Sequence, residues 1–100
     1  MKALGLIDAL GLTTAVTALD AACKAADVTL IGVERTIGAG TIIGVTINLA
    51  GDVAAVQAAV QAGVDAGNRA GKIIASHVIP RPHEEVEKLI KKFEKNLNIK

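Results

Sequence analysis

The chain has almost no aromatic residues: Phe93 stands alone, without Trp or Tyr, in 100 residues. Aromatic side chains normally supply much of the buried area of a small core, at about 150–250 Å² each. Hydrophobic residues make up 51% of the chain, but 18 of the residues are alanine, which buries little area. We therefore expect flat, closely packed helices, and we favour further burial of the surface against copies of the same chain.

The chain also lacks a charge excess, a cysteine framework and a long apolar run. With 11 basic and 10 acidic residues, it has no basic face for nucleic acid, and side chains that could stack on bases are missing. Cys23 alone excludes an internal disulfide or a cysteine-clustered zinc site. No segment approaches the ~20 apolar residues of a membrane span, and residues 1–8 do not form a secretory signal. We expect a cytoplasmic protein without nucleic-acid or membrane partners.

The hydrophobic pattern predicts seven elements in the order β-α-β-β-α-β-α. The expected elements are a strand over 3–7, a helix from Leu12 to Asp27, strands over 28–33 and 43–49, a helix opened by Asp52 as N-cap and closed at Gly71, a strand over 72–79 and a helix from Pro82. This order predicts the α+β class: a ferredoxin-like βαββαβ antiparallel sheet with two helices on one face, plus a C-terminal helix.

Each helix has an apolar stripe that we expect to face the core. In the first helix the stripe is Leu12, Val16, Leu19, Cys23 and Ala26, so Cys23 is interpreted as a small core residue. In the second helix the stripe is Val53, Val56, Val60 and Val64.

No pattern in the sequence indicates a catalytic or metal site. His77 lies in an apolar strand and His83 at a helix start, and neither has the spacing of a metal-binding pair. We interpret both as structural residues. The glutamates that open the last helix suit the helix dipole. The sequence therefore predicts no enzyme, no catalytic residue, no metal and no cofactor.

The stretch Gly38-Ala39-Gly40 leaves two interpretations open. A dinucleotide loop would require a third glycine and a following helix, but a strand follows here. A hairpin turn is compatible with the glycines. The flanking isoleucines Ile37, Ile42 and Ile43 favour a loop that meets protein, such as backbone lining a passage between subunits.

Four motifs in order resemble the BMC domain, the hexagonal shell protein of bacterial microcompartments. They are ALGLID near the N-terminus, LDAACKAADVTLIGVE, GDVAAVQAAVQAGVDAG and HVIPRPHEEVEKLI. The resemblance extends to about Ile90, which suggests a single BMC domain over 1–90 and a C-terminal helical extension or tail over 91–100.

This resemblance implies a structural, self-assembling protein. Members of the family form flat homohexamers with a central pore, and these tile with other shell hexamers and pentamers around encapsulated enzymes in the cytoplasm. It assigns Lys24, Asp27 and Arg81 to the hexamer edge. It assigns Ile37, Gly38, Ala39, Gly40 and Thr41 to the pore.

The sequence also departs from the family pattern. Between Glu34 and Gly51 it carries about four extra residues, Ala39 replaces the pore serine, and Ala50 replaces the Arg of an Arg-Gly-Asp motif. We expect a less polar pore than is usual in the family. Asp27 takes the place of a frequent Asn and could pair with Lys24. The alternative function is a ferredoxin-like regulatory module that binds a small molecule, as the PII-type proteins do. Lys24 and the Pro-Arg-Pro-His signature argue against it.

Overall fold

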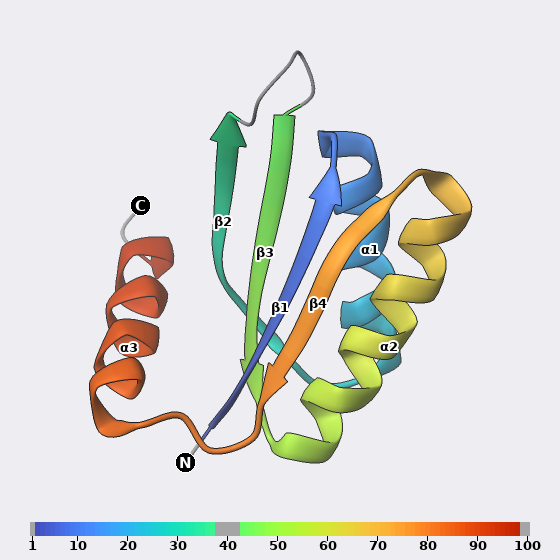
Figure 1. Ribbon diagram of the computed structural model, residues 1–100. Coiled ribbons are helices and arrows are strands. Elements are labelled where there is room, and N and C mark those ends of the chain that lie inside the picture. Colours follow the sequence, from blue (N-terminus) through green and yellow to red (C-terminus); the bar gives the residue numbers. More distant parts are fainter. Residues whose placement is uncertain (1, 38–42, 99–100) are drawn as a thin grey trace.

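A computed structural model describes the backbone of residues 2–37 and 43–98, and the side chains of residues 2–35, 43–89, 91 and 92. Four strands form one sheet in the order β2-β3-β1-β4 (Figure 1). The elements are β1 (Ala3–Leu10), α1 (Leu12–Ala25), β2 (Thr29–Ile37), β3 (Ile43–Gly51), α2 (Val53–Ala70), β4 (Ile73–Ile79) and α3 (Glu84–Asn98).

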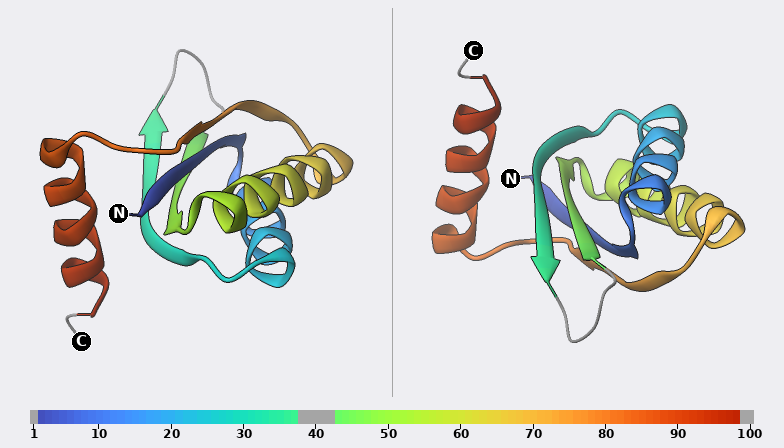
Figure 2. Two further views of the ribbon diagram at one scale, coloured as in Figure 1. Left: turned by 90° about the horizontal axis from the view of Figure 1, so that it is seen from below. Right: turned by 90° about the horizontal axis from the view of Figure 1, so that it is seen from above.

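All neighbouring strands in the sheet are antiparallel. Helices α1 and α2 lie together on one face of the sheet, and α3 lies on the other side of it, beyond β2 (Figure 2). The ferredoxin-like α+β prediction is therefore confirmed. Within the described ranges, no helix is long and apolar enough to cross a membrane.

The main core lies between the sheet and the pair α1 and α2. Ile7, Val45, Ile47 and Leu49 point from β1 and β3 toward the helices and are fully buried, as the period-two pattern predicts. The buried Val56 and Val60 of α2 meet them, so the stripe predicted for this helix does face the core.

Small residues let the two helices approach each other closely. A methyl group added at Gly63 of α2 would lie 2.9 Å from the carbonyl oxygen of Ala18 in α1 and 2.8 Å from the Cδ1 atom of Ile7. Ala18 and Ala22 of α1 are completely buried in this contact region. The expectation of closely packed, alanine-rich helices is met here.

The stripe predicted for α1 is right only for Leu19 and Ala26, which pack against the core. The buried face of the helix consists of Thr14, Ala15, Ala18 and Ala22, while Leu12, Val16 and Cys23 are exposed. The physical reason is the short distance between the helices, because the space between α1 and α2 admits methyl groups and no larger side chain. The larger apolar residues of α1 consequently lie on its outer surface.

A second, smaller core lies on the opposite face of the sheet. There Leu4, Ile31 and Ala50 are buried, and Val86 of α3 packs against them. Pro82 is also fully buried just before α3. This core holds the start of α3 against the sheet and buries Ala50, the residue that departs from the expected Arg-Gly-Asp pattern.

Several element ends differ from the predictions. β1 and β2 are both longer than predicted, at Ala3–Leu10 and Thr29–Ile37. Asp52 occupies the N-cap position of α2, but its side chain makes no capping hydrogen bond. Gly71 caps the other end through its N–H, which donates to the carbonyl of Gly67, and its φ of −172° is extended rather than left-handed.

Candidate functional site

The segment predicted to line a pore joins two strands at one end of the sheet. β2 ends at Ile37, which pairs with Ile43 at the start of β3. The backbone N–H of Gly11, just after β1, donates to the carbonyl of Ile43 at 2.8 Å. Gly38, Ala39, Gly40 and Thr41 lie outside the described residues, and the side chain of Ile37 does as well. Their role at a pore stays a prediction.

The three predicted edge residues lie at the opposite end of the sheet. Lys24 is in the last turn of α1, Asp27 comes between α1 and β2, and Arg81 follows β4. The register places this end where β1 begins, since Ala3 pairs with Gly51 and Leu4 with Ile79. All three side chains are exposed. The fold therefore brings Lys24, Asp27 and Arg81 to one end of the molecule.

Lys24 is held by a neighbour on its own helix. Its Nζ atom lies 2.9 Å from an Asp20 carboxylate oxygen, and the two side chains are 76% and 60% exposed. Exposed pairs spaced i,i+4 contribute only about 0.3–0.5 kcal/mol. Lys24 can therefore exchange Asp20 for another acceptor at small cost. Asp27, which the sequence offered as a possible partner of Lys24, is not the residue that pairs with it here.

Arg81 is exposed, but the chain next to it is packed against the sheet. The residue after it, Pro82, is fully buried, and His83 then opens α3. The Nδ1 atom of His83 accepts a hydrogen bond from the N–H of Glu85 at 3.2 Å, and the His83 carbonyl accepts one from the N–H of Glu87 at 3.0 Å. The structural interpretation of His83 is thus confirmed: it caps α3. The buried Pro82 thus fixes the position of the chain directly after Arg81.

Cys23 lies on the exposed side of α1, not in the core. Partial desolvation, followed by the negative charge of Asp20, raises the pKa of the Cys23 thiol. A raised pKa leaves less thiolate at neutral pH, and the thiolate is the reactive form. The surroundings of Cys23 are therefore the reverse of those that activate a nucleophile.

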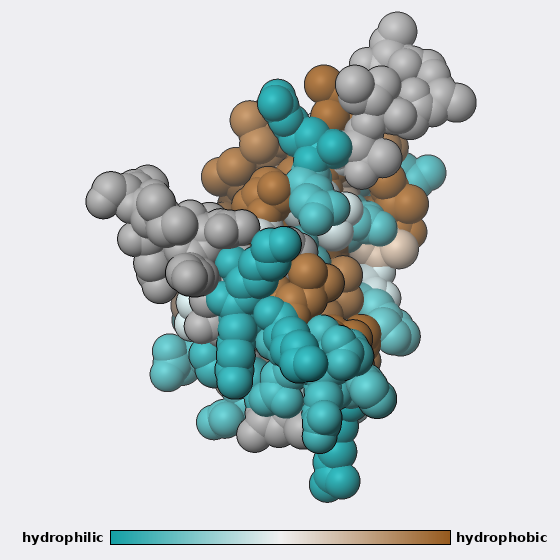
Figure 3. All heavy atoms as spheres, turned by 90° about the vertical axis from the view of Figure 1, so that its left-hand side faces the viewer, coloured by the Kyte–Doolittle hydropathy of each residue, from teal (hydrophilic) through white to brown (hydrophobic). Residues whose placement is uncertain are grey.

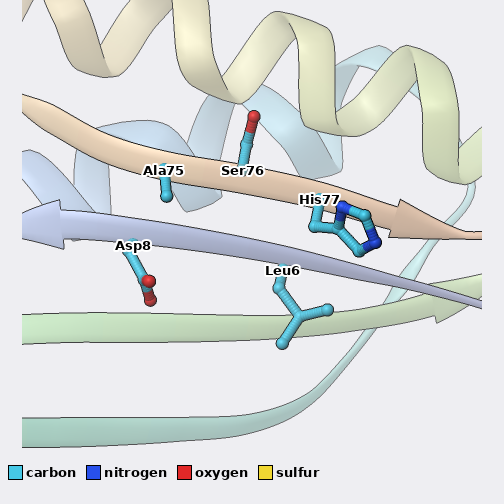
Figure 4. Close-up of a pocket in the computed structure, with 5 residues that line it drawn as sticks. All are labelled: Leu6, Asp8, Ala75, Ser76 and His77. Atoms are coloured by element: carbon cyan, nitrogen blue, oxygen red, sulfur yellow. The ribbon is translucent and has the colours of Figure 1, made fainter.

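The open face of the sheet has a hollow of about 230 Å³. Leu6, Asp8, Ala75, Ser76 and His77 line it, and Ser76 points toward the helices, away from Asp8 and Leu6 (Figure 4). The Asp8 carboxylate accepts a hydrogen bond from the Thr46 hydroxyl. Over the described part of the chain, no three His, Cys, Asp or Glu side chains come together as a metal site would require.

Sequence reasoning missed one group of surface residues. Large hydrophobic side chains are exposed at Leu12 and Val16 of α1, Val33 of β2, Ile43 of β3 and Ile74 of β4. The signal was present in the sequence, because Leu12 and Val16 belong to a regular apolar stripe. An apolar stripe predicts burial, and for Leu12 and Val16 that burial would have to be against another molecule.

The fold and these surfaces define a small α+β domain whose exposed groups are suited to contacts with protein, and the described residues bring together no metal-binding cluster. The BMC domain family model matches residues 3–82. The chain belongs to the BMC domain family, and the resemblance found in the sequence is confirmed.

Curated relatives match nearly end to end. The bacterial microcompartment shell protein PduA of Citrobacter freundii is 48% identical over 91 residues, which cover 91% of this chain and 94% of that protein. EutM of Escherichia coli K12, also a microcompartment shell protein, is 46% identical over 89% of this chain and 88% of its own length. The carboxysome shell protein CcmK1 of Thermosynechococcus vestitus is 46% identical over 85% of this chain and 74% of that protein.

A solved structure also matches the fold. It is a microcompartment protein from Desulfitobacterium hafniense, with a TM-score of 0.76 and 33% identity over 88% of this chain. The match spans 48%, about half, of that longer chain.

Proposed function

We propose that this chain is a structural shell protein of a bacterial microcompartment, forming closed hexamers that tile edge to edge into a facet. The proposal rests first on family membership, because the relatives named above are shell proteins. It assigns the chain no catalytic step. Its partners would be further copies, other shell hexamers and pentamers, and the enzymes that the shell encloses in the cytoplasm.

The observation that carries this proposal is the separation of the two predicted surfaces. The segment between Ile37 and Ile43 starts and ends at one end of the sheet, while Lys24, Asp27 and Arg81 lie at the other. The eight residues of β1 span these ends, and at ~3.4 Å per residue they separate them by about 25 Å. In a flat ring, such a protomer would direct one end to the axis and the other to the perimeter.

The pore would be lined by Ile37, Gly38, Ala39, Gly40 and Thr41. Passage of small metabolites through it would be passive, decided by the radius and the polarity of the lining. With Ala39 in place of a serine, each subunit offers one hydroxyl fewer. We therefore expect polar metabolites to pass less readily than through a serine-lined pore.

The experiment combines native mass spectrometry with negative-stain microscopy of the purified chain. We expect a hexamer in the first and hexagonal sheets or tubes in the second. Lys24→Ala should keep the hexamer and abolish the sheets. Lys88→Ala is a matched control, because Lys88 is 73% exposed and also forms a surface ion pair, with Glu85 at 3.3 Å, but lies on α3. It should leave the sheets unchanged.

Two results would contradict the proposal. Sheets that persist unchanged in Lys24→Ala would show that the assignment of the edge is wrong. A stable trimer that binds nucleotide in calorimetry would overturn the shell function and favour the regulatory alternative.

A further inference from the structure

The end of the molecule that carries Lys24 has a polar surface. Figure 3 shows the side with β2 and α3, where hydrophilic side chains cover most of the lower half, at the start of β2 and of α3, and hydrophobic ones gather in the upper half. Lys24, Asp27 and Arg81, which lie at this same end, are exposed and charged. A contact between hexamers at this end would therefore depend on individual charged groups, and a residue that restrains one of them would affect the contact.

Asp20 lies one helical turn before Lys24, on the side away from this end. Helix α1 starts at Leu12, directly after Gly11, whose N–H bonds to the carbonyl of Ile43 where β3 begins. From there the helix runs toward the opposite end of the sheet. At 1.5 Å per residue, the backbone of Asp20 is about 6 Å behind that of Lys24 along the helix. The Lys24 Nζ atom lies 2.9 Å from the Asp20 carboxylate. The ammonium is therefore turned back along α1 rather than outward from the end.

A second carboxylate lies beyond Lys24 in the chain, but it is not the partner. Asp27 follows α1 and is exposed, yet the ion pair of Lys24 is made with Asp20. The Cα–Cβ bonds of a helix tilt toward its N-terminus, which favours a partner four residues before the lysine. The inward position of the ammonium is thus the one that the helix itself favours.

The pair is weak in one chain, but a closed ring would carry it once per subunit. An exposed ion pair at this spacing shifts an equilibrium by about twofold. If each Lys24 leaves Asp20 before it binds a neighbouring hexamer, a hexamer surrounded in a sheet breaks one pair per subunit. Over six subunits these factors multiply to about sixtyfold. A contact with little effect on the fold of one chain can therefore set the protein concentration at which sheets form.

We propose that Asp20 competes with neighbouring hexamers for Lys24: it draws the ammonium back along α1 and so raises the concentration of hexamers needed for sheet formation. The inference rests on the proposed function, which places Lys24 at the hexamer edge but gives Asp20 no role. Asp20 is in this sense a positioning residue, because it acts on assembly only through the lysine that it holds.

The test compares the threshold concentration for sheet formation, measured by light scattering, with the hexamer verified by native mass spectrometry. Asp20→Asn should keep the hexamer and lower the threshold by at least about tenfold, a conservative part of the sixtyfold limit. Asp20→Glu keeps the charge and should stay close to the parent protein. Asp65→Asn is the matched control: Asp65 is exposed and also bonds to a residue four positions away, Gln61 at 3.0 Å, but lies on α2. It removes the same charge and should leave the threshold unchanged.

A double variant shows whether Asp20 acts through Lys24. Lys24→Ala/Asp20→Asn should form no sheets, as expected for Lys24→Ala alone, and sheets from the double variant would overturn the inference. A threshold that is unchanged or higher in Asp20→Asn, or equally lowered in Asp65→Asn, also overturns it and leaves the shell function standing. If neither the parent nor Asp20→Asn forms sheets at any concentration, both proposals fail.

Discussion

Substitution of Gly63 by alanine tests the close approach of α1 and α2 directly. In an open helix this change stabilises by about 1 kcal/mol, because alanine has the higher helix propensity. Here the new methyl group would lie 2.9 Å from the Ala18 carbonyl oxygen and 2.8 Å from Ile7 Cδ1. The end of Ile7 can rotate away, but the Ala18 oxygen is backbone within α1 and moves only with the helix.

The magnitude follows from two opposing terms. Overpacking of this kind costs about 1–3 kcal/mol, and the gain in propensity offsets about 1 kcal/mol of that cost. We therefore expect Gly63→Ala to lower the free energy of unfolding by about 1 kcal/mol. For a domain of this size, that corresponds to a fall in Tm of about 4–8 °C. Gly63→Val adds two further carbon atoms at the same place and should cost substantially more.

The assay is urea unfolding followed by circular dichroism, with the protein concentration fixed because association shifts apparent stability. The slope of the free energy with urea should not change. Ala58→Gly, at an exposed position of α2, calibrates the propensity term and should cost about 1 kcal/mol. If Gly63→Ala instead stabilises the protein by a similar amount, then α1 and α2 are not in close contact at this position, and the reasoning fails.

Two further predictions concern the surface. Arg81→Ala should raise the protein concentration needed for sheet formation, measured by light scattering, at least about tenfold, since a hydrogen bond from a charged group contributes ~1.5–3 kcal/mol. Arg81→Lys should restore little of the sheet formation, because lysine lacks the planar fork of donors. Full restoration by lysine would show that only the charge matters. Because the pKa of the Cys23 thiol is raised, the rate of its labelling by maleimide should increase only at a pH above the ordinary range of a thiol. Asp20→Asn removes a negative charge and should move the midpoint of this pH–rate profile to lower pH. An unchanged midpoint would show that Asp20 does not influence the thiol.

The order of the elements could be predicted from the sequence because each element carries its own signal. The valines of α2 predict its inner face, and this face is found. The alternation from Ile43 onward predicts a half-buried strand; the strand is found, but Asn48 and Ala50 are buried as well, so its second half is covered on both faces. The HVIPRPH motif indicated the turn into α3, where Pro82 is buried and His83 caps the helix. These local patterns predict the structure well because tertiary packing favours the same elements as the local sequence does.

The inner face of α1 could not be predicted in the same way. Periodicity reports that Leu12 and Val16 share one face of a helix, but not what covers that face. Helix α2 determines which face of α1 is buried, since Gly63 and Gly67 leave room only for residues as small as Ala18 and Ala22. Leu12 and Val16 are thus left outside, and large aliphatic residues exposed on one helix are typical of a subunit in an assembly.

The two ends of the molecule would therefore hold the assembly together by different forces. Lys24, Asp27 and Arg81 are exposed charged groups, and attraction between such groups is screened within a Debye length of about 8–10 Å at physiological salt. Leu12, Val16 and Ile74 are aliphatic, and burial of apolar surface does not weaken with added salt and is strengthened by sulfate. Contacts between hexamers should consequently yield to ionic strength before the contacts within a hexamer do.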